Sequence, residues 1–308
     1  MTIETVVAGA VQVIGGVVVA PFLVGLTQLL KARLQGRRGP SPIQPYRELR
    51  RLWGKSGVDV VGTTVIYRLV PVVVVAAIGA AVLLVPAAVG APGFGVGHDA
   101  LTLAGLLVLA RIAICVAAWD LSNGFSLQGA SRDLMFAVFV EVTLVLCVVV
   151  AALVAGTTDL RGIIAGTAGI DPWASPVLIL GAVAFAVVVI AETGRQPVDN
   201  PDTHLELTMI HEGPLLEYAG RDQALLQWAM AARHWLVLVI ATQIFLPHPE
   251  GIWWQLGLLP VWLVVLCGAL ALTETLVAKM RVLLVPRLIG ASAGVAFVGV
   301  IIWLSGAA

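Results

Sequence analysis

Charge is scarce in this sequence. Only 12% of its 308 residues are Asp, Glu, Lys or Arg, whereas soluble domains carry roughly 25%. Hydrophobic residues make up 59% of the chain, and the mean hydropathy is +1.00. This composition excludes an ordinary soluble domain and is typical of a protein that crosses a membrane several times. The net charge is zero, which by itself says nothing about nucleic acid, and we expect no nucleic-acid partner.

Cysteine is equally scarce. Cys115, Cys147 and Cys267 lie far apart, each inside an apolar stretch. This spacing fits neither a disulfide framework nor a metal or iron–sulfur site. We interpret the three residues as small apolar packing residues and expect no metal and no cofactor in this chain.

Long apolar runs, in contrast, fill most of the sequence. A helix that spans a bilayer needs about 20 mainly apolar residues, and backbone polar groups cannot stay unpaired in lipid. The first run lacks a basic segment before it and continues to Leu30, so we predict a membrane helix there rather than a signal peptide. We predict an all-α, polytopic membrane protein forming one domain, 1–308. Eight helices are expected at 5–30, 69–90, 100–118, 134–155, 174–191, 224–246, 253–273 and 284–305.

Lys and Arg gather on one side of the predicted bundle. Fifteen of the 18 basic residues lie in the connections 31–68, 119–133, 192–223 and 274–283 or just after the last of them, at Arg287. The opposite connections hold only Arg161. By the positive-inside rule, both termini face outward and the main loops face the cytoplasm of a plasma membrane. Absence of an internal repeat argues against a transporter built from inverted halves.

The first inner loop contains the segment KARLQGRRGPSPIQPYRELRRLWGKSG, Lys31 to Gly57. Its glycines and prolines forbid a continuous helix at its start, whereas 46–55 is a plausible short helix. Tyr46, Leu49, Leu52 and Trp53 would share one face of that helix, with Arg47, Arg50, Arg51 and Lys55 elsewhere. This pattern is typical of an interfacial helix on anionic lipid. The simpler alternative is a basic loop that only fixes orientation.

A second inner loop, ETGRQPVDNPDTHLELTMIHEGPLLEYAG from Glu192 to Gly220, is rich in acids. Asp199, Asp202 and Glu206 have the spacing of an aspartate-rich site for Mg²⁺ and a diphosphate. Pro201 interrupts that pattern, and no second acidic motif exists in the chain. Zinc is also disfavoured, because His204, Glu206, His211 and Glu212 do not form H-E-x-x-H and no cysteine is near.

A third interpretation is a shaped docking surface and cavity wall. Prolines and glycines of this loop force several turns, and its leucines are too apolar for a freely solvated segment. Between Pro201 and Pro214 there is room for one short helix, which Asp202 or Thr203 could cap.

Ionisable residues also occur where lipid is expected. They are Arg111, Glu141, Arg233 and His234 within predicted spans, and Glu274 and Lys279 at the inner end of the seventh. Such residues are costly in a bilayer and are usually paired or functional. Either Arg111 or Arg233 pairs with Glu141 to join helices, or the residues form a polar track for protons.

Both inner loops resemble those of the respiratory complex I subunit 1 family. The second loop shares the framework E-T-x-R-x-P-x-D-x-P followed by E-Y-x-G, and the first shares its R-x-G-P and Q-P elements. The segments GRRGPSPIQPYRELRRLWGK and ETLVAKMRVLLVPRLIG resemble formate hydrogenlyase subunit 4 and membrane-bound nickel–iron hydrogenases. Gly194, where the complex I version has Asn, bears on the quinone-like pocket.

The resemblance implies a membrane-anchor and ion-coupling subunit that is not itself catalytic. Its partners would be hydrophilic hydrogenase-like small and large subunits, antiporter-like membrane subunits and the lipid bilayer. Iron–sulfur clusters and a nickel–iron centre would belong to those partners. Cavity and proton-coupling residues would be Glu141, Glu192, Asp199, Asp202, Glu206, Glu212 and Glu217, with Arg37, Arg38, Arg195 and Tyr218 at docking contacts.

Two alternative functions remain open at this point. One is a quinone-reactive subunit of the complex I type. The other, from a different class, is a stand-alone ion or solute transporter.

Overall fold

Helices account for nearly all of the secondary structure in the computed structural model. It describes residues 3–58, 60–89, 99–121, 123–168, 170–199, 210–249 and 251–306. Within these ranges there is no strand, only an isolated bridge between Asp99 and Asp159. The long helices are α1 (Ile3–Ile14), α2 (Ala20–Leu34), α4 (Val65–Leu84), α5 (Ala100–Asp120), α6 (Gly124–Ala155), α8 (Pro176–Glu192), α9 (Gly220–Phe245), α10 (Ile252–Leu276) and α11 (Val285–Leu304), and the shorter ones are α3 (Gln44–Trp53) and α7 (Leu160–Thr167).

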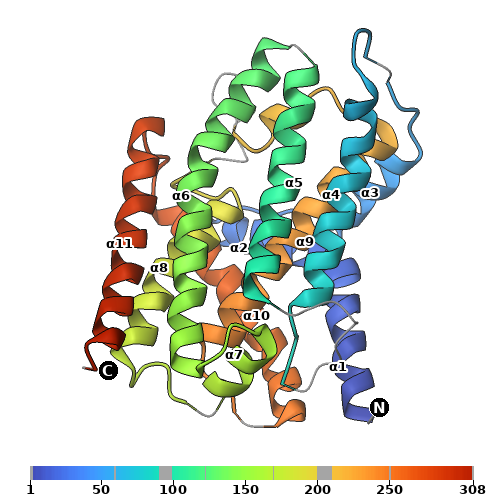
Figure 1. Cartoon of the computed structure of the whole chain (residues 1–308). Helices are drawn as coiled ribbons and strands as arrows, with labels where there is room; N and C mark the ends of the chain where they lie inside the picture. The colour runs from blue at the N-terminus through green and yellow to red at the C-terminus, as the bar shows by residue number, and fades with distance from the viewer. Residues whose placement is uncertain are drawn as a thin grey trace.

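Each predicted span coincides with a helix. In the described residues, seven helices are long and apolar enough to cross a membrane, whereas α8 is shorter. The prediction of a polytopic all-α protein is therefore confirmed, and the count of eight crossings stays a prediction. Both termini lie at the same end of the bundle, with α3 near the opposite end (Figure 1). This arrangement fits an even number of crossings, but the side that faces the cytoplasm stays a prediction.

The first span is one continuous helical rod, Ile3–Leu34, with a π-helical turn at Gly15–Val19. Pro21 explains the turn, because proline has no N–H to donate to the carbonyl four residues earlier, Val17. Trp228 Nε1 on α9 donates to that carbonyl instead, at 3.0 Å. The Tyr46 hydroxyl on α3 donates to the next carbonyl, Val18. Side chains from two other helices thus satisfy the interrupted backbone.

The amphipathic helix predicted at 46–55 is α3, which begins two residues earlier and ends at Trp53. It packs against α2 and α9. Leu52 is buried, but Trp53, which we predicted on the same apolar face, is 53% exposed. The apolar side of α3 therefore serves packing on the bundle, and its predicted contact with anionic lipid stays a prediction.

Helix α6 begins at Gly124, ten residues before the span predicted at 134–155. The Asn123 side chain accepts a hydrogen bond from the Phe125 N–H at 3.0 Å and caps this early start. Ser126, Gly129 and Ala130 on this added segment are buried. Asp133, which lies just outside the predicted span, is consequently inside a helix.

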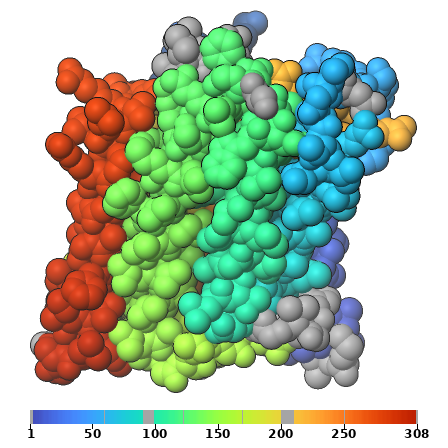
Figure 2. All heavy atoms as spheres, turned by 45° about the horizontal axis from the view of Figure 1, so that its top comes forward, coloured from blue at the N-terminus to red at the C-terminus, as the bar shows by residue number. Residues whose placement is uncertain are grey.

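Helix α9 occupies the centre of the molecule. It contacts α2, α3, α4, α8 and α10, and every residue from His234 to Phe245 is buried. Helices α10 and α11, in contrast, expose much of their apolar surface. Figure 2 shows α11 along one edge of the molecule, with α6 and α5 beside it. Any charged residue on the inner face of α9 is therefore held within protein.

Candidate functional site

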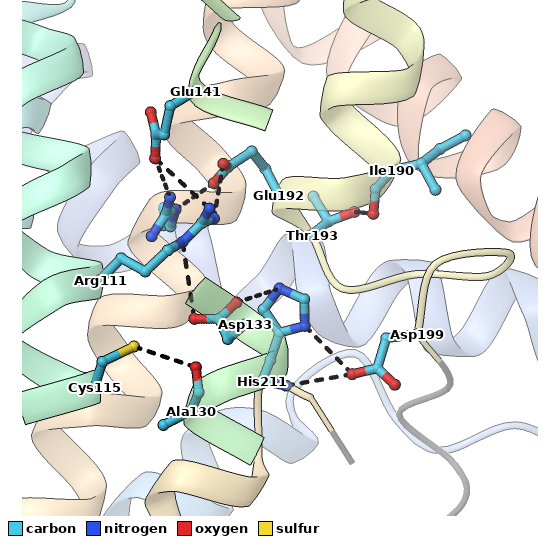
Figure 3. Close-up of polar contacts among 11 residues, drawn as sticks. Arg111, Cys115, Ala130, Asp133, Glu141, Ile190, Glu192, Thr193, Asp199 and His211 are labelled. Atoms are coloured by element: carbon cyan, nitrogen blue, oxygen red, sulfur yellow. Dashed lines mark hydrogen bonds and ion pairs between the residues drawn. The ribbon is translucent and has the colours of Figure 1, made fainter. Parts of the chain in front are cut away.

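Four helices bring four charged side chains into one buried cluster. Arg111 on α5 approaches Glu192 at the end of α8, with 2.8 Å between Nη2 and Oε1. Arg233 on α9 bonds the other oxygen of Glu192 through Nε. Glu141 on α6 lies 3.7 Å from Arg111 and 3.6 Å from Arg233. Figure 3 shows Glu141 and Glu192 both turned toward Arg111.

This four-residue cluster balances two guanidinium groups against two carboxylates. None of its side chains is more than 13% exposed. A charged side chain at the centre of a membrane helix costs roughly 2.5–3.5 kcal/mol on insertion scales, so mutual pairing is what makes four of them tolerable. Both carboxylate oxygens of Glu141 nevertheless lack a hydrogen-bond partner among the described residues. Glu192 is thus held firmly, and Glu141 is held by charge alone.

The cluster continues toward the loop that follows α8. Asp133 Oδ2 lies 3.9 Å from Arg111 Nε, and Asp133 Oδ1 lies 3.7 Å from His211 Nε2. His211 Nδ1 lies 3.3 Å from Asp199 Oδ2, and the ammonium group of Lys279 lies 3.1 Å from Asp199 Oδ1. A chain of alternating charges therefore runs from the four-helix cluster to the connection after α10.

The protonation of His211 depends on this surrounding charge. Burial lowers the pKa of His211, but the hydrogen bond to Asp199 and the negative charges of Asp133 and Asp199 raise it. The net result is a pKa above the ordinary value for histidine. Proximity to the two aspartates thus outweighs desolvation.

A second buried group joins α2, α10 and the loop after α8. Arg195 Nη1 lies 3.2 Å from Glu274 Oε2, and Lys31 Nζ lies 3.5 Å from the same oxygen. Glu274 is 4% exposed. His234 on α9 is 3% exposed, and its Nε2 has no hydrogen-bond partner among the described residues.

Both groups border one cavity of about 340 Å³. One part of its wall is apolar and includes Val24 of α2, Leu49 of α3 and Met230 of α9. The other part is polar. It is formed by Arg111, Asp133, Glu192, Arg195, Asp199, His211, Glu212, Arg233 and His234. A cavity with one apolar wall and one charged wall suits an amphipathic occupant or ordered water.

Close packing fixes the shape of the second inner loop. Gly194 has a φ of +61°, and a Cβ at this position would lie 3.2 Å from His211 Nδ1. Further along, Tyr218 stacks on Tyr67 of α4 with ring centroids 4.2 Å apart. The Tyr218 hydroxyl donates to the Tyr67 carbonyl at 2.9 Å. The loop is thereby tied to α4 at one end and fitted around His211 at the other.

Most of the predicted intramembrane and cavity residues gather around this site. Arg111, Glu141, Glu192, Asp199, Arg233, His234, Glu274 and Lys279 belong to the two groups described above or lie beside them, and Glu212 lines the cavity. Glu217 does not, because its carboxylate accepts a hydrogen bond from Asn123. Asp202 and Glu206 lie outside the described residues, as do both predicted caps of the short helix. Within 210–219, the described helix is the single 3₁₀ turn Gly213–Leu215.

The predicted docking residues differ in exposure. Arg37 and Arg38 are exposed in the connection between α2 and α3, as a contact with a partner requires. Arg195 and Tyr218 are 5% and 3% exposed, and their partners within the chain are Glu274 and Tyr67. They shape the loop from inside, and docking through them stays a prediction.

Sequence reasoning missed Asp133, His211 and Lys31 as members of the site. Asp133 was placed one residue before the predicted span, and His211 was considered only as a zinc ligand. A usable signal existed for Asp133: it precedes Glu141 by eight residues, which is about two helical turns. No local pattern indicates Lys31, because its partner Glu274 lies at the other end of the chain.

Comparisons with known proteins extend over nearly the whole chain. The family described as NADH dehydrogenase matches residues 7–304. Formate hydrogenlyase subunit 4 of Escherichia coli is 33% identical over 290 residues, 91% of this chain and 92% of that protein. Hydrogenase-4 component C of E. coli is 30% identical over 298 residues, 93% of this chain and 92% of that protein.

More distant relatives show the same architecture. A membrane component of the NADH-quinone oxidoreductase of Rickettsia prowazekii is 27% identical over 233 residues, 73% of this chain and 65% of that protein. A chain in the structure of the membrane-bound sulfane sulfur reductase, an archaeal respiratory membrane complex, superposes with a TM-score of 0.84. The match covers 98% of this chain and all of that one at 21% identity, so it shows a shared fold.

Proposed function

Because the chain belongs to the NADH dehydrogenase family, of the complex I subunit 1 type, we propose that it is the membrane-anchor and ion-coupling subunit of a multisubunit energy-converting oxidoreductase. A complex of the hydrogenase or formate hydrogenlyase kind is supported best. The two E. coli relatives of that kind are at least 30% identical over more than 90% of this chain, whereas the Rickettsia relative is 27% identical over 73%.

The buried ion-pair cluster is the observation that carries the coupling role. Arg111 and Arg233 hold Glu192 and Glu141 between four helices, and Asp133, His211 and Asp199 continue the charges toward the loop after α8. A charge that changes near this loop alters the protonation of the acids beyond it through electrostatic interaction. Such a chain of groups is what a protein needs to link a redox event to ion movement.

Partners would bind at the end of the bundle that carries α3 and the two inner loops, on the cytoplasmic side. Hydrophilic hydrogenase-like subunits would dock there, with the iron–sulfur clusters and any nickel–iron centre within them. Arg37 and Arg38 are exposed at this end and available to acidic groups of a partner. Antiporter-like membrane subunits would cover part of the exposed apolar helices.

Purification of the tagged chain from its native membranes tests this proposal. Hydrophilic iron–sulfur subunits should be recovered with it in mild detergent, together with further membrane subunits. Repeated recovery of the chain alone would contradict the anchor function. Transport by the isolated chain in liposomes would support a stand-alone transporter instead.

A quinone-reactive subunit is the second candidate, and the cavity of about 340 Å³ favours it. Its apolar wall at Val24, Leu49 and Met230 would suit an isoprenoid-substituted ring, and its polar wall would face the ring oxygens. If this candidate is correct, ligands of quinone sites should inhibit electron transfer by the purified complex. Insensitivity to them, with electron transfer intact, would leave the hydrogenase-type function.

A further inference from the structure

His211 lies between two carboxylates from different parts of the fold. Its Nε2 is 3.7 Å from Asp133 Oδ1 on α6. Its Nδ1 is 3.3 Å from Asp199 Oδ2 in the loop after α8, and its backbone N–H also donates to that oxygen, at 3.4 Å. Figure 3 shows the imidazole ring between the two aspartates. Each ring nitrogen thus faces an acid, and the two acids lie on opposite sides of the ring.

The two aspartates lead to different regions of the protein. Asp133 approaches Arg111 at 3.9 Å and so belongs to the four-helix cluster. Asp199 pairs with Lys279, after the end of α10. The charged groups that act on His211 among the described residues are Arg111 from α5, Asp133 from α6, Glu192 from α8 and Asp199 from the loop. His211 is the link between the loop acid and the buried cluster.

We propose that His211 is a proton-transfer residue that passes protons between Asp199 and Asp133. The proposal rests on the ion-coupling function proposed above and adds a specific path to it. Imidazole suits this task because it can accept a proton at one nitrogen and release another from the second nitrogen. Neither an amide nor a hydroxyl in this position would exchange protons at neutral pH in the same way.

The transfer conserves atoms and charge. The neutral ring begins with its proton on Nε2, facing Asp133. The O–H bond of a protonated Asp199 breaks and an N–H bond forms at Nδ1, while the N–H bond at Nε2 breaks and an O–H bond forms on Asp133. Since 3.7 Å exceeds a direct hydrogen bond, the second transfer requires either a small ring rotation or one bridging water. The reverse transfer, or rotation of the ring, restores the first tautomer.

Two further observations agree with this role. His211 lines the cavity, so small molecules and water can reach it from that space. The pKa of His211 is lowered by burial but raised further by its two aspartate neighbours, so the ring binds protons more readily than an isolated histidine. A structural role, in which the ring only joins the loop to α6, would require the hydrogen bonds but not the proton exchange.

Chemical rescue separates the two roles. Inverted membrane vesicles that contain the whole complex would receive reduced methyl viologen as the electron donor, and a pH-sensitive dye would report proton movement. His211→Ala and His211→Gln should both assemble, as shown by co-purification of the partner subunits. We expect both to slow proton movement by about tenfold or more, a conservative figure for the loss of a proton-transfer group.

Imidazole and 4-methylimidazole in the medium should then restore proton movement in His211→Ala, to a degree that follows the pKa of the added base. His211→Gln should stay slow, because its amide fills the space and can form hydrogen bonds without carrying protons. His248→Ala is the matched control. The His248 ring contacts only the Leu246 and Ile164 carbonyls among the described residues, and its replacement should neither slow proton movement nor respond to imidazole.

Proton movement at the wild-type rate in His211→Gln would overturn the proposal. So would a slow, fully assembled His211→Ala that no imidazole base rescues, because that result indicates a structural role. Failure of the underlying coupling function has a different signature. In that case wild-type vesicles themselves show no viologen-dependent proton movement, whatever residue occupies position 211.

Discussion

Arg111 Nη2 lies 2.8 Å from Glu192 Oε1 and joins α5 to α8 across 81 positions of the sequence. The Glu192 side chain has no exposed surface, and that of Arg111 is 4% exposed. Arg233 engages the second oxygen of the same carboxylate. Because guanidinium groups do not lose their protons in proteins, any change of protonation in this cluster occurs on its acids. The two arginines therefore set which acid is charged.

Replacement of Glu192 by Gln should destabilise the protein strongly. It leaves Arg111 and Arg233 with a neutral partner in a buried site, and loss of one member of a buried ion pair costs about 3–5 kcal/mol. Thermal denaturation of the tagged chain in detergent-solubilised native membranes would measure the change. Glu4→Gln is the control, since Glu4 contacts an exposed Trp253 ring at the other end of the bundle. Equal melting temperatures for the two variants would contradict a structural contribution of the Arg111–Glu192 pair.

Replacement of Glu141 by Gln should impair coupled activity while the complex still assembles. Glu141 is 3.6–3.7 Å from its two arginines, and neither of its oxygens has a hydrogen-bond partner among the described residues. Its loss therefore costs less stability than that of Glu192, whose carboxylate still holds both arginines. Co-purification of partner subunits and the ratio of ions moved per electron are the measurements. Unchanged coupling would remove Glu141 from the path.

Part of this site could be predicted from the sequence, and the physical reason for the limit is specific. Arg111, Glu141 and Arg233 stand out because charges are rare in long apolar runs. Their partners do not stand out. Pairing with Glu192 depends on how α5, α8 and α9 pack, and no periodicity within one helix encodes that arrangement. Both arginines turn out to pair with both glutamates, whereas the sequence offered one pair as an alternative to a polar track.

The fold was more accessible to prediction than the site, because span length and hydropathy are local properties. The errors lie where tertiary packing decides the structure. Helix α6 extends to Gly124 because Asn123 caps it, although the added residues are polar. Trp53 is exposed although it follows Leu52 on an apolar stretch, because the two side chains point to different faces of α3. Neither outcome follows from composition.

Replacement of Gly25 by Ala should disturb the wall of the cavity. A Cβ at Gly25 would clash with the Pro42 carbonyl, and both residues lie in the segments that carry cavity residues Val24 and Gln44. Because the obstacle is backbone rather than a flexible side chain, overpacking should cost about 1–3 kcal/mol. Gly79→Ala is the matched control in α4, where a Cβ meets nothing within 4 Å. Thermal stability that falls equally in both variants would show that the close contact with Pro42 is not responsible.

The stability of the protein should fall as pH rises through the titration of His211. Burial lowers the pKa of His211, and the Asp199 hydrogen bond and both aspartate charges raise it above its ordinary value, about 6.5 in an unfolded chain. A group with a raised folded-state pKa contributes its full stabilisation below about pH 6.5 and loses it as pH passes the folded value.

Melting temperatures of wild type and His211→Gln, measured from pH 5.5 to 9 in detergent-solubilised membranes, would test this dependence. Wild type should exceed His211→Gln by most at the acidic end, and the difference should shrink above about pH 6.5. His248→Gln should keep the wild-type slope, because its ring contacts backbone carbonyls rather than acids. A difference between wild type and His211→Gln that grows with pH would mean that burial, not the pair of aspartates, dominates the protonation of His211.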